Sequence, residues 1–186
     1  MNSKQDSRIL HSKAWIREAF LQILSEQPFE DITIKQITER AGVSRQTFYA
    51  HYAQKEDVLG ECLDFFFFEL SQKMQQNLQV EPNLEQLSSL LVAHLKEQEE
   101  FLRTLFQSNL DIFLLRKLES FLATTWLTPI MQARQHHSII RDNDLVTFLA
   151  AGCFFTGKKI IATKDPIDLD YYCKVLFSLL NTLLQA

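Results

Sequence analysis

Three polar residues in a row, Arg45-Gln46-Thr47, carry the side chains that suit the edges of DNA bases. Arg can donate two hydrogen bonds to a guanine edge, Gln can pair with an adenine edge, and the Thr methyl can meet a thymine methyl. They follow Ser44, which can cap a helix start, so they are expected in the first turn of a helix. The alternative is a solvated helix start that contacts nothing. We favour base reading for Arg45, Gln46 and Thr47.

Side chains that suit phosphate oxygens flank this triplet. Hydroxyls and an ammonium can bind phosphates and fix register without reading sequence. Tyr52 and His51 are two such candidates. The alternative for Tyr52 is a place in the core, and the alternative for His51 is a surface residue without a specific contact. Lys4, Arg8 and Lys13 are candidates for a mobile arm that reaches flanking phosphates or the minor groove. The predicted DNA contacts are therefore Thr33, Ser44, Arg45, Gln46, Thr47, Tyr49, His51, Tyr52 and Lys55.

The elements that would position these side chains form a helix-turn-helix. Apolar residues at helical spacing predict a first helix over residues 8–27, ended by Pro28. Thr33 is an N-cap candidate for a short second helix, and Gly42 stands where a tight turn needs positive φ. In the third helix Phe48 is expected to face the core, which leaves the helix start exposed for a major groove.

The stretches Thr33-Ile34-Lys35-Gln36-Ile37, 41–52 (AGVSRQTFYAHY) and Lys55-Glu56-Asp57-Val58-Leu59 resemble the DNA-binding head of the TetR family of bacterial transcriptional regulators. The resemblance covers about residues 8–60. It implies an all-helical dimer, a C-terminal domain that often holds a small effector, and repression as the usual outcome. Thr38 departs from the Ala usual in the family. Gln54 replaces a better N-cap, which predicts a slightly weaker start for the linking helix from Lys55.

The charge distribution agrees with a DNA-binding head. Residues 1–55 carry 8 basic and 6 acidic side chains (+2), and the rest carry 11 and 17 (−6), which sums to the net charge of −4. Only the contacting face must meet phosphates, so overall acidity does not exclude DNA. An apolar share of 46% indicates a globular chain. We expect no membrane span, no secretion signal and a cytoplasmic location.

Neither a cofactor, a metal nor an enzymatic activity is expected. The three cysteines, Cys62, Cys153 and Cys173, form no CxxC pair, and the chain lacks HExxH, GxSxG and GxxxxGK patterns. His136 and His137 are adjacent, point in different directions on a helix, and have no partner ligands at suitable spacing.

The rest of the chain is predicted to be a helical body over residues 54–186, behind a DNA-binding domain over residues 1–53. Helices are expected at 55–79, 84–95, 99–106, 110–135 (ended or kinked at Pro129), from Asp142 or Asn143 through Phe155, and after Asp165-Pro166. The aromatic residues of the body are candidate walls of an apolar effector pocket, with plain core packing as the alternative for each: Phe65, Phe68, Phe101, Phe106, Phe113, Phe121 and Trp126.

The prediction is thus an all-α protein that binds a palindromic operator as a homodimer through its last two helices. A repressor released by a small apolar effector is the preferred function. The alternative is an activator or architectural factor controlled by a protein partner, with no small ligand.

Overall fold

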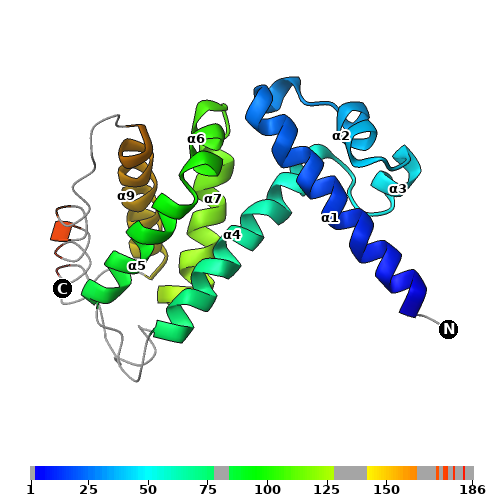
Figure 1. Cartoon of the computed structure of the whole chain (residues 1–186). Helices are drawn as coiled ribbons and strands as arrows, with labels where there is room; N and C mark the ends of the chain where they lie inside the picture. Colours follow the sequence, from blue (N-terminus) through cyan, green and yellow to red (C-terminus); the bar gives the residue numbers. More distant parts are fainter. Residues whose placement is uncertain are drawn as a thin grey trace. The chain divides into compact units, whose positions relative to one another are not determined.

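The computed structural model describes residues 3–77, 84–127 and 142–162, together with residues 171, 174, 175, 178 and 182. Within these residues the secondary structure is helical throughout, without a β-strand (Figure 1). The chain forms two compact units. The first, called the head, comprises residues 1–66 and 107–109, and the second, called the body, comprises residues 67–106 and 110–186.

The head contains α1 (Ser3–Glu26), η1 (Phe29–Asp31), α2 (Ile34–Ala41), α3 (Arg45–Tyr49) and the first turns of α4 (Lys55–Asn77). Helix α1 begins five residues earlier than predicted and ends before Pro28 as expected. Residues 3–13, where the sequence suggested an arm with Lys4, Arg8 and Lys13, are part of this helix.

The turn between α2 and α3 follows the predicted capping chemistry. Thr33 accepts a hydrogen bond from the Gln36 amide, and the Gln36 side chain accepts from the Thr33 amide, which completes a capping box. Gly42 has φ of 65°, in the left-handed region that suits glycine. The Ser44 hydroxyl accepts from the Thr47 amide at 3.0 Å. These three predictions are confirmed.

The core of the head fixes the exposed side of α3. Phe48 is fully buried, as are Ile16 and Phe20 of α1 and Ile37 of α2. Figure 1 shows α2 and α3 beside α1, and α1 and α2 are in contact. Since α3 is held by Phe48 alone among its five residues, the rest of its surface remains available.

The body contains the remainder of α4 with α5 (Leu84–Glu97), α6 (Glu99–Gln107, whose last residue belongs to the head), α7 (Asp111–Phe121), η2 (Leu122–Leu127) and α9 (Asp142–Ala162). The helix predicted over 110–135 ends as an α-helix at Phe121 and continues as a π-helical segment. Pro129 and most of the final predicted helix lie outside the described residues. Asp142 and Asn143, the predicted caps of α9, already belong to that helix. The body core joins α4, α7 and α9 through Leu70, Phe121, Leu145 and Leu149.

Helix α9 alone, among the described residues, is long and apolar enough to span a membrane by length and composition. The sequence analysis did not anticipate such a segment. Leu145, Leu149, Phe154 and Ile160 of this helix are buried in the structure, which is typical of a core helix.

Candidate nucleic-acid interface

The first turn of α3 presents the base-reading candidates. Arg45 and Gln46 are exposed, whereas Thr47 is half-buried and its hydroxyl lies 2.9 Å from that of Ser44. Buried Phe48, the next residue, holds the helix by its opposite side. Arg45 and Gln46 therefore point away from the core on a helix of fixed orientation, which is the geometry needed to enter a major groove.

Tyr49 and Thr33 lie at the edges of this surface. Tyr49 is 58% exposed, and its ring packs edge-on against Phe48. The Thr33 hydroxyl is exposed but donates to the Gln36 side chain at 2.7 Å. Both hydroxyl groups lie in the head, at the ends of the two helices that form the motif.

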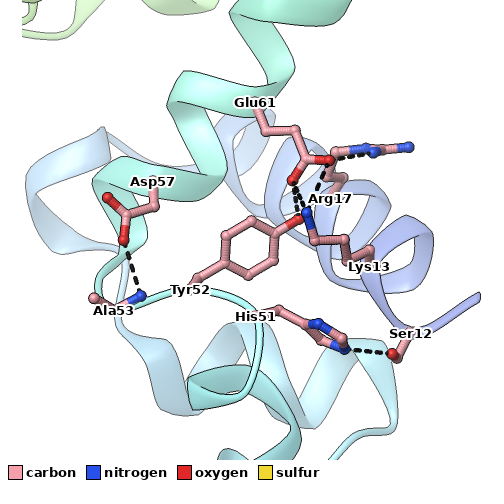
Figure 2. Close-up of polar contacts among 8 residues, drawn as sticks. All are labelled: Ser12, Lys13, Arg17, His51, Tyr52, Ala53, Asp57 and Glu61. Carbon is pink, nitrogen blue, oxygen red and sulfur yellow. Dashed lines mark hydrogen bonds and ion pairs between the residues drawn. The ribbon is translucent and has the colours of Figure 1, made fainter. Parts of the chain in front are cut away.

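The turn after α3 is pinned to α1 rather than open to solvent. The His51 Nε2 atom lies 2.7 Å from the Ser12 hydroxyl, and Tyr52 is buried with its ring against Phe48. Figure 2 shows Tyr52 pointing between α1 and α4, toward Glu61. Of the two alternatives for Tyr52, the structure places it in the core. His51 is half-buried and makes a specific contact, so it is not a plain surface residue.

The Glu61 carboxylate is the common partner of three side chains where α1, α4 and the turn after α3 meet. Its carboxylate accepts hydrogen bonds from the Tyr52 hydroxyl, from Arg17 at 2.9 Å and from Lys13 at 3.4 Å (Figure 2). Burial acts to raise the pKa of Glu61, but the Tyr52 hydrogen bond and the two cations outweigh it and hold the pKa below its ordinary 4.5. Burial, with the adjacent carboxylate, raises the pKa of Tyr52. The arrangement joins α1 and α4 to the turn that follows α3.

Lys55 takes a role that the sequence analysis did not foresee. Its ammonium donates to the carbonyl oxygens of Phe29 at 2.7 Å, Glu30 at 3.0 Å and Ile32 at 2.8 Å. An ammonium has three donors, so all of them are used within the head. The structure thus gives this ammonium partners within the head, and the phosphate contact stays a prediction.

The amides before α4 are also engaged. The Asp57 carboxylate accepts from the amides of Ala53 at 2.9 Å and Gln54 at 3.1 Å (Figure 2). Gln54 led us to predict a weak start for this helix. The acidic residue Asp57 in the first turn, which reaches back as a cap, was not predicted. The spacing of Asp57 three residues after Gln54 was the signal that could have revealed it.

The described candidate effector residues differ in their exposure and in their neighbours. Phe65 is 46% exposed beneath the Arg17 guanidinium, and Phe68 is 57% exposed. Neither side chain is buried, and whether they line an effector pocket stays a prediction. Phe67 stacks on buried Phe121 instead. Phe106 packs edge-on against Phe154, while Phe101 and Phe113 are half-buried. The side chain of Trp126 lies outside the described part.

Within the ranges described, no three His, Cys, Asp or Glu side chains stand close enough together to hold a metal ion. His136 and His137 lie outside those ranges. Burial raises the pKa of Cys62 to about 12, so this thiol is protonated at neutral pH.

Comparison with known proteins agrees with this geometry. Residues 16–62 match the family model of bacterial regulatory proteins of the tetR family. A 55-residue segment, 29% of the chain, is 42% identical to the uncharacterized HTH-type transcriptional regulator YxbF of Bacillus subtilis, and it covers 14% of that relative.

Solved structures resemble nearly the whole chain in fold. A TetR transcriptional regulator from Streptococcus agalactiae has a TM-score of 0.73 at 23% identity, over 96% of this chain and 98% of that one. A putative TetR-family regulator from Syntrophomonas wolfei has a TM-score of 0.70 at 17% identity, over 94% and 95%. The dihydroxyacetone kinase operon activator DhaS has a TM-score of 0.57 at 21% identity, over 94% of each chain.

Proposed function

The chain is a DNA-binding transcriptional regulator of the TetR family and not an enzyme, and from this premise we propose that it is a cytoplasmic, homodimeric repressor controlled by a small effector. The observation that carries the DNA-reading part is the exposed pair Arg45 and Gln46 beside fully buried Phe48. A short helix held by one face must present its other face outward.

In the proposed complex, the first turn of α3 enters the major groove, and we therefore call α3 the recognition helix. Arg45 takes a guanine edge, Gln46 takes an adenine edge, and the Thr47 methyl meets a thymine methyl. Ser44 caps this turn, and its exposed position suits a phosphate beside the groove. These contacts are expected to provide sequence selectivity.

Phosphate contacts are proposed on either side of the groove. Tyr49 and Thr33 supply hydroxyl groups, since Tyr49 is exposed and Thr33 stands at the N-terminus of α2. His51 lies close to this surface but is tied to Ser12. Tyr52 and Lys55 act indirectly, because their polar atoms are already bonded within the head.

Dimerisation is proposed through the exposed face of α9 and the helix predicted after Asp165-Pro166. Phe148, Gly152 and Phe155 are exposed at i, i+4 and i+7, which places them on one side of α9. Among the described residues, no side chain and no neighbouring element reaches within 4 Å of the position that a Cβ would take at Gly152, which leaves room there for a second helix. Two protomers would place their recognition helices in successive major grooves, about 34–36 Å apart.

The effector is proposed to bind in the body, where α4, α7 and α9 form an apolar core. It would release DNA by binding more tightly to a conformation whose heads are wrongly spaced. Activation is the alternative to repression, because DhaS, which is similar in fold, is named as an operon activator. In the alternative function, the chain is an activator or architectural factor that a protein partner controls, and no small ligand binds.

Selection of bound DNA from a random pool tests the proposal. We expect a palindrome whose half-sites are spaced by one helical turn, and enrichment of no motif would overturn the DNA-reading assignment. A thermal-shift screen against apolar and cationic small molecules then separates the two modes of control, since an effector must stabilise the folded chain. Stabilisation by no compound would favour the partner-controlled alternative.

A further inference from the structure

The four residues Phe29–Ile32 connect α1 to α2 and lie immediately before Thr33, the cap of α2. The side chains of Phe29 and Ile32 are buried, whereas Glu30 and Asp31 are exposed. We call these four residues the connector. A shift of the connector would move the start of α2, and α2 is joined to the recognition helix by the tight turn at Gly42.

Lys55, in the first turn of α4, holds the connector from one side. Its ammonium donates to three of the four connector carbonyls, with distances of 2.7, 3.0 and 2.8 Å, and lies 4.5 Å from the centre of the Phe29 ring. Charged hydrogen bonds are stronger than neutral ones, and here they converge on one cation. The start of α4 is thereby tied to the backbone of the connector.

The turn between α6 and α7 holds the connector through other atoms. The Phe29 amide donates to the hydroxyl of buried Ser108 at 3.5 Å, and the Asn109 amide donates to the Glu30 carboxylate at 3.1 Å. Hydrogen bonds from the amides of Glu30 and Asn109 lower the pKa of Glu30, so this carboxylate is charged at neutral pH. Residues 107–109 belong to the head unit.

The chain passes between the two units at three points: within α4 after Phe66, before Gln107 and after Asn109. The crossing within α4 leads back to Lys55, and the other two bound the 107–109 turn. Each route along the chain from the body into the head thus ends at a residue that is bonded to the connector.

We propose that the connector couples the body to DNA reading, with Lys55 as the positioning residue that sets the start of α2. This inference rests on the proposed operator binding. A change in the body that displaces α4 or the 107–109 turn pulls on the same short segment, and the segment transmits the displacement to α2 and α3. Lys55 affects DNA affinity through the connector and touches no phosphate.

Hydrogen exchange tests this coupling without any DNA. In Lys55→Met, exchange at the Ile32 amide and, across the connector, at the Asn109 amide is expected to rise about tenfold, the effect of losing a charged hydrogen bond. In Ser108→Ala, exchange at Ile32 is expected to rise as well. If Lys55→Met leaves Asn109 unchanged, the two attachments are independent and the inference is wrong.

Operator titrations over a range of salt concentrations separate positioning from phosphate contact. The DNA used is the sequence selected by the wild-type chain, so a failure of operator binding shows itself before any variant is made. Lys55→Met is expected to weaken binding about tenfold with an unchanged salt slope, because no phosphate contact is lost. A slope reduced by about one would identify Lys55 as a phosphate ligand and overturn the inference.

Combining the variants gives a third readout. If Lys55 and Ser108 act through one segment, the double variant should bind the operator no more than about twofold more weakly than Lys55→Met alone, whereas independent sites multiply their effects. Lys96→Met, at an exposed position of α5, removes the same charge and is the matched control, with operator affinity expected to be unchanged. Circular dichroism verifies that each variant folds. If Lys55→Met does not fold, the smaller change Ser108→Ala still tests the connector by hydrogen exchange at Ile32.

Discussion

The Tyr52 hydroxyl, just after the recognition helix, donates a hydrogen bond to the Glu61 carboxylate in the second turn of α4. The same carboxylate accepts from Lys13 and Arg17 of α1. One charged group therefore ties α1 and α4 to the turn that follows α3. Removal of the Glu61 carboxylate should weaken the packing of α1 and α4 against the turn after the recognition helix, without changing a residue that faces DNA.

The pKa of Glu61 predicts a pH dependence of stability. Because the folded pKa lies below the ordinary 4.5, the stabilisation is fully present above pH 4.5 and is lost as the pH falls through the folded value. Urea titrations from pH 7 to pH 3 should show that the wild-type free energy of unfolding falls more steeply below pH 4.5 than that of Glu61→Gln. Glu39→Gln, in an exposed ion pair with Lys35, should keep the wild-type profile. Identical profiles for wild type and Glu61→Gln would refute the assignment.

Tyr52→Phe isolates the hydroxyl from the ring. The ring stays buried, so the expected loss of about 1.5–3 kcal/mol in unfolding free energy is that of a hydrogen bond to a charged group. Denaturant unfolding measures the loss. The salt slope of operator binding should stay at the wild-type value, and a flatter slope would show that the hydroxyl contacts a phosphate after all.

Asp57→Ala tests the cap at the start of α4. The carboxylate satisfies the amides of Ala53 and Gln54, and loss of such a cap costs about 1 kcal/mol. Thermal or urea unfolding should show this loss for Asp57→Ala but a much smaller one for Glu56→Ala, which stands one residue earlier in the same turn. Equal losses would mean that first-turn charge in general, and not this cap, is what matters.

Phe155→Glu tests the proposed dimer face. An unpaired carboxylate buried between two protomers is unfavourable, so sedimentation at micromolar concentration should show a monomer. Ile112→Glu, at a still more exposed position on α7, serves as the control and should remain dimeric. A dimeric Phe155→Glu, or a monomeric wild type, would place the interface elsewhere or remove it.

The local structure of the head was predictable from sequence because its signals are short in range. Thr33, Gly42 and Ser44 each act on amides or dihedral angles within a few residues, and the structure confirms all three. The family resemblance over about residues 8–60 agrees with the matched residues 16–62. The end of α1 before Pro28 follows from the same local chemistry, whereas its start at Ser3 was not predicted.

The role of Lys55 was not predictable, because its partners lie 23 to 26 residues earlier in the chain. A Lys at a helix start looks alike whether it meets a phosphate or three carbonyls. The four consecutive Phe at 65–68 posed a similar problem. Helical spacing shows that they point in different directions, but only packing decides that Phe66 and Phe67 turn inward while Phe65 and Phe68 are exposed.

The central claim is that Arg45, in the exposed first turn of α3, reads a base. Selection from a random DNA pool with the wild type and with Arg45→Ala tests it most directly, with Arg116→Ala on α7 as the control. We predict that Arg45→Ala loses preference at one symmetry-related base position in each half-site and binds the wild-type operator about 1–3 kcal/mol more weakly, while Arg116→Ala matches the wild type. An unchanged motif and unchanged affinity for Arg45→Ala would contradict the account.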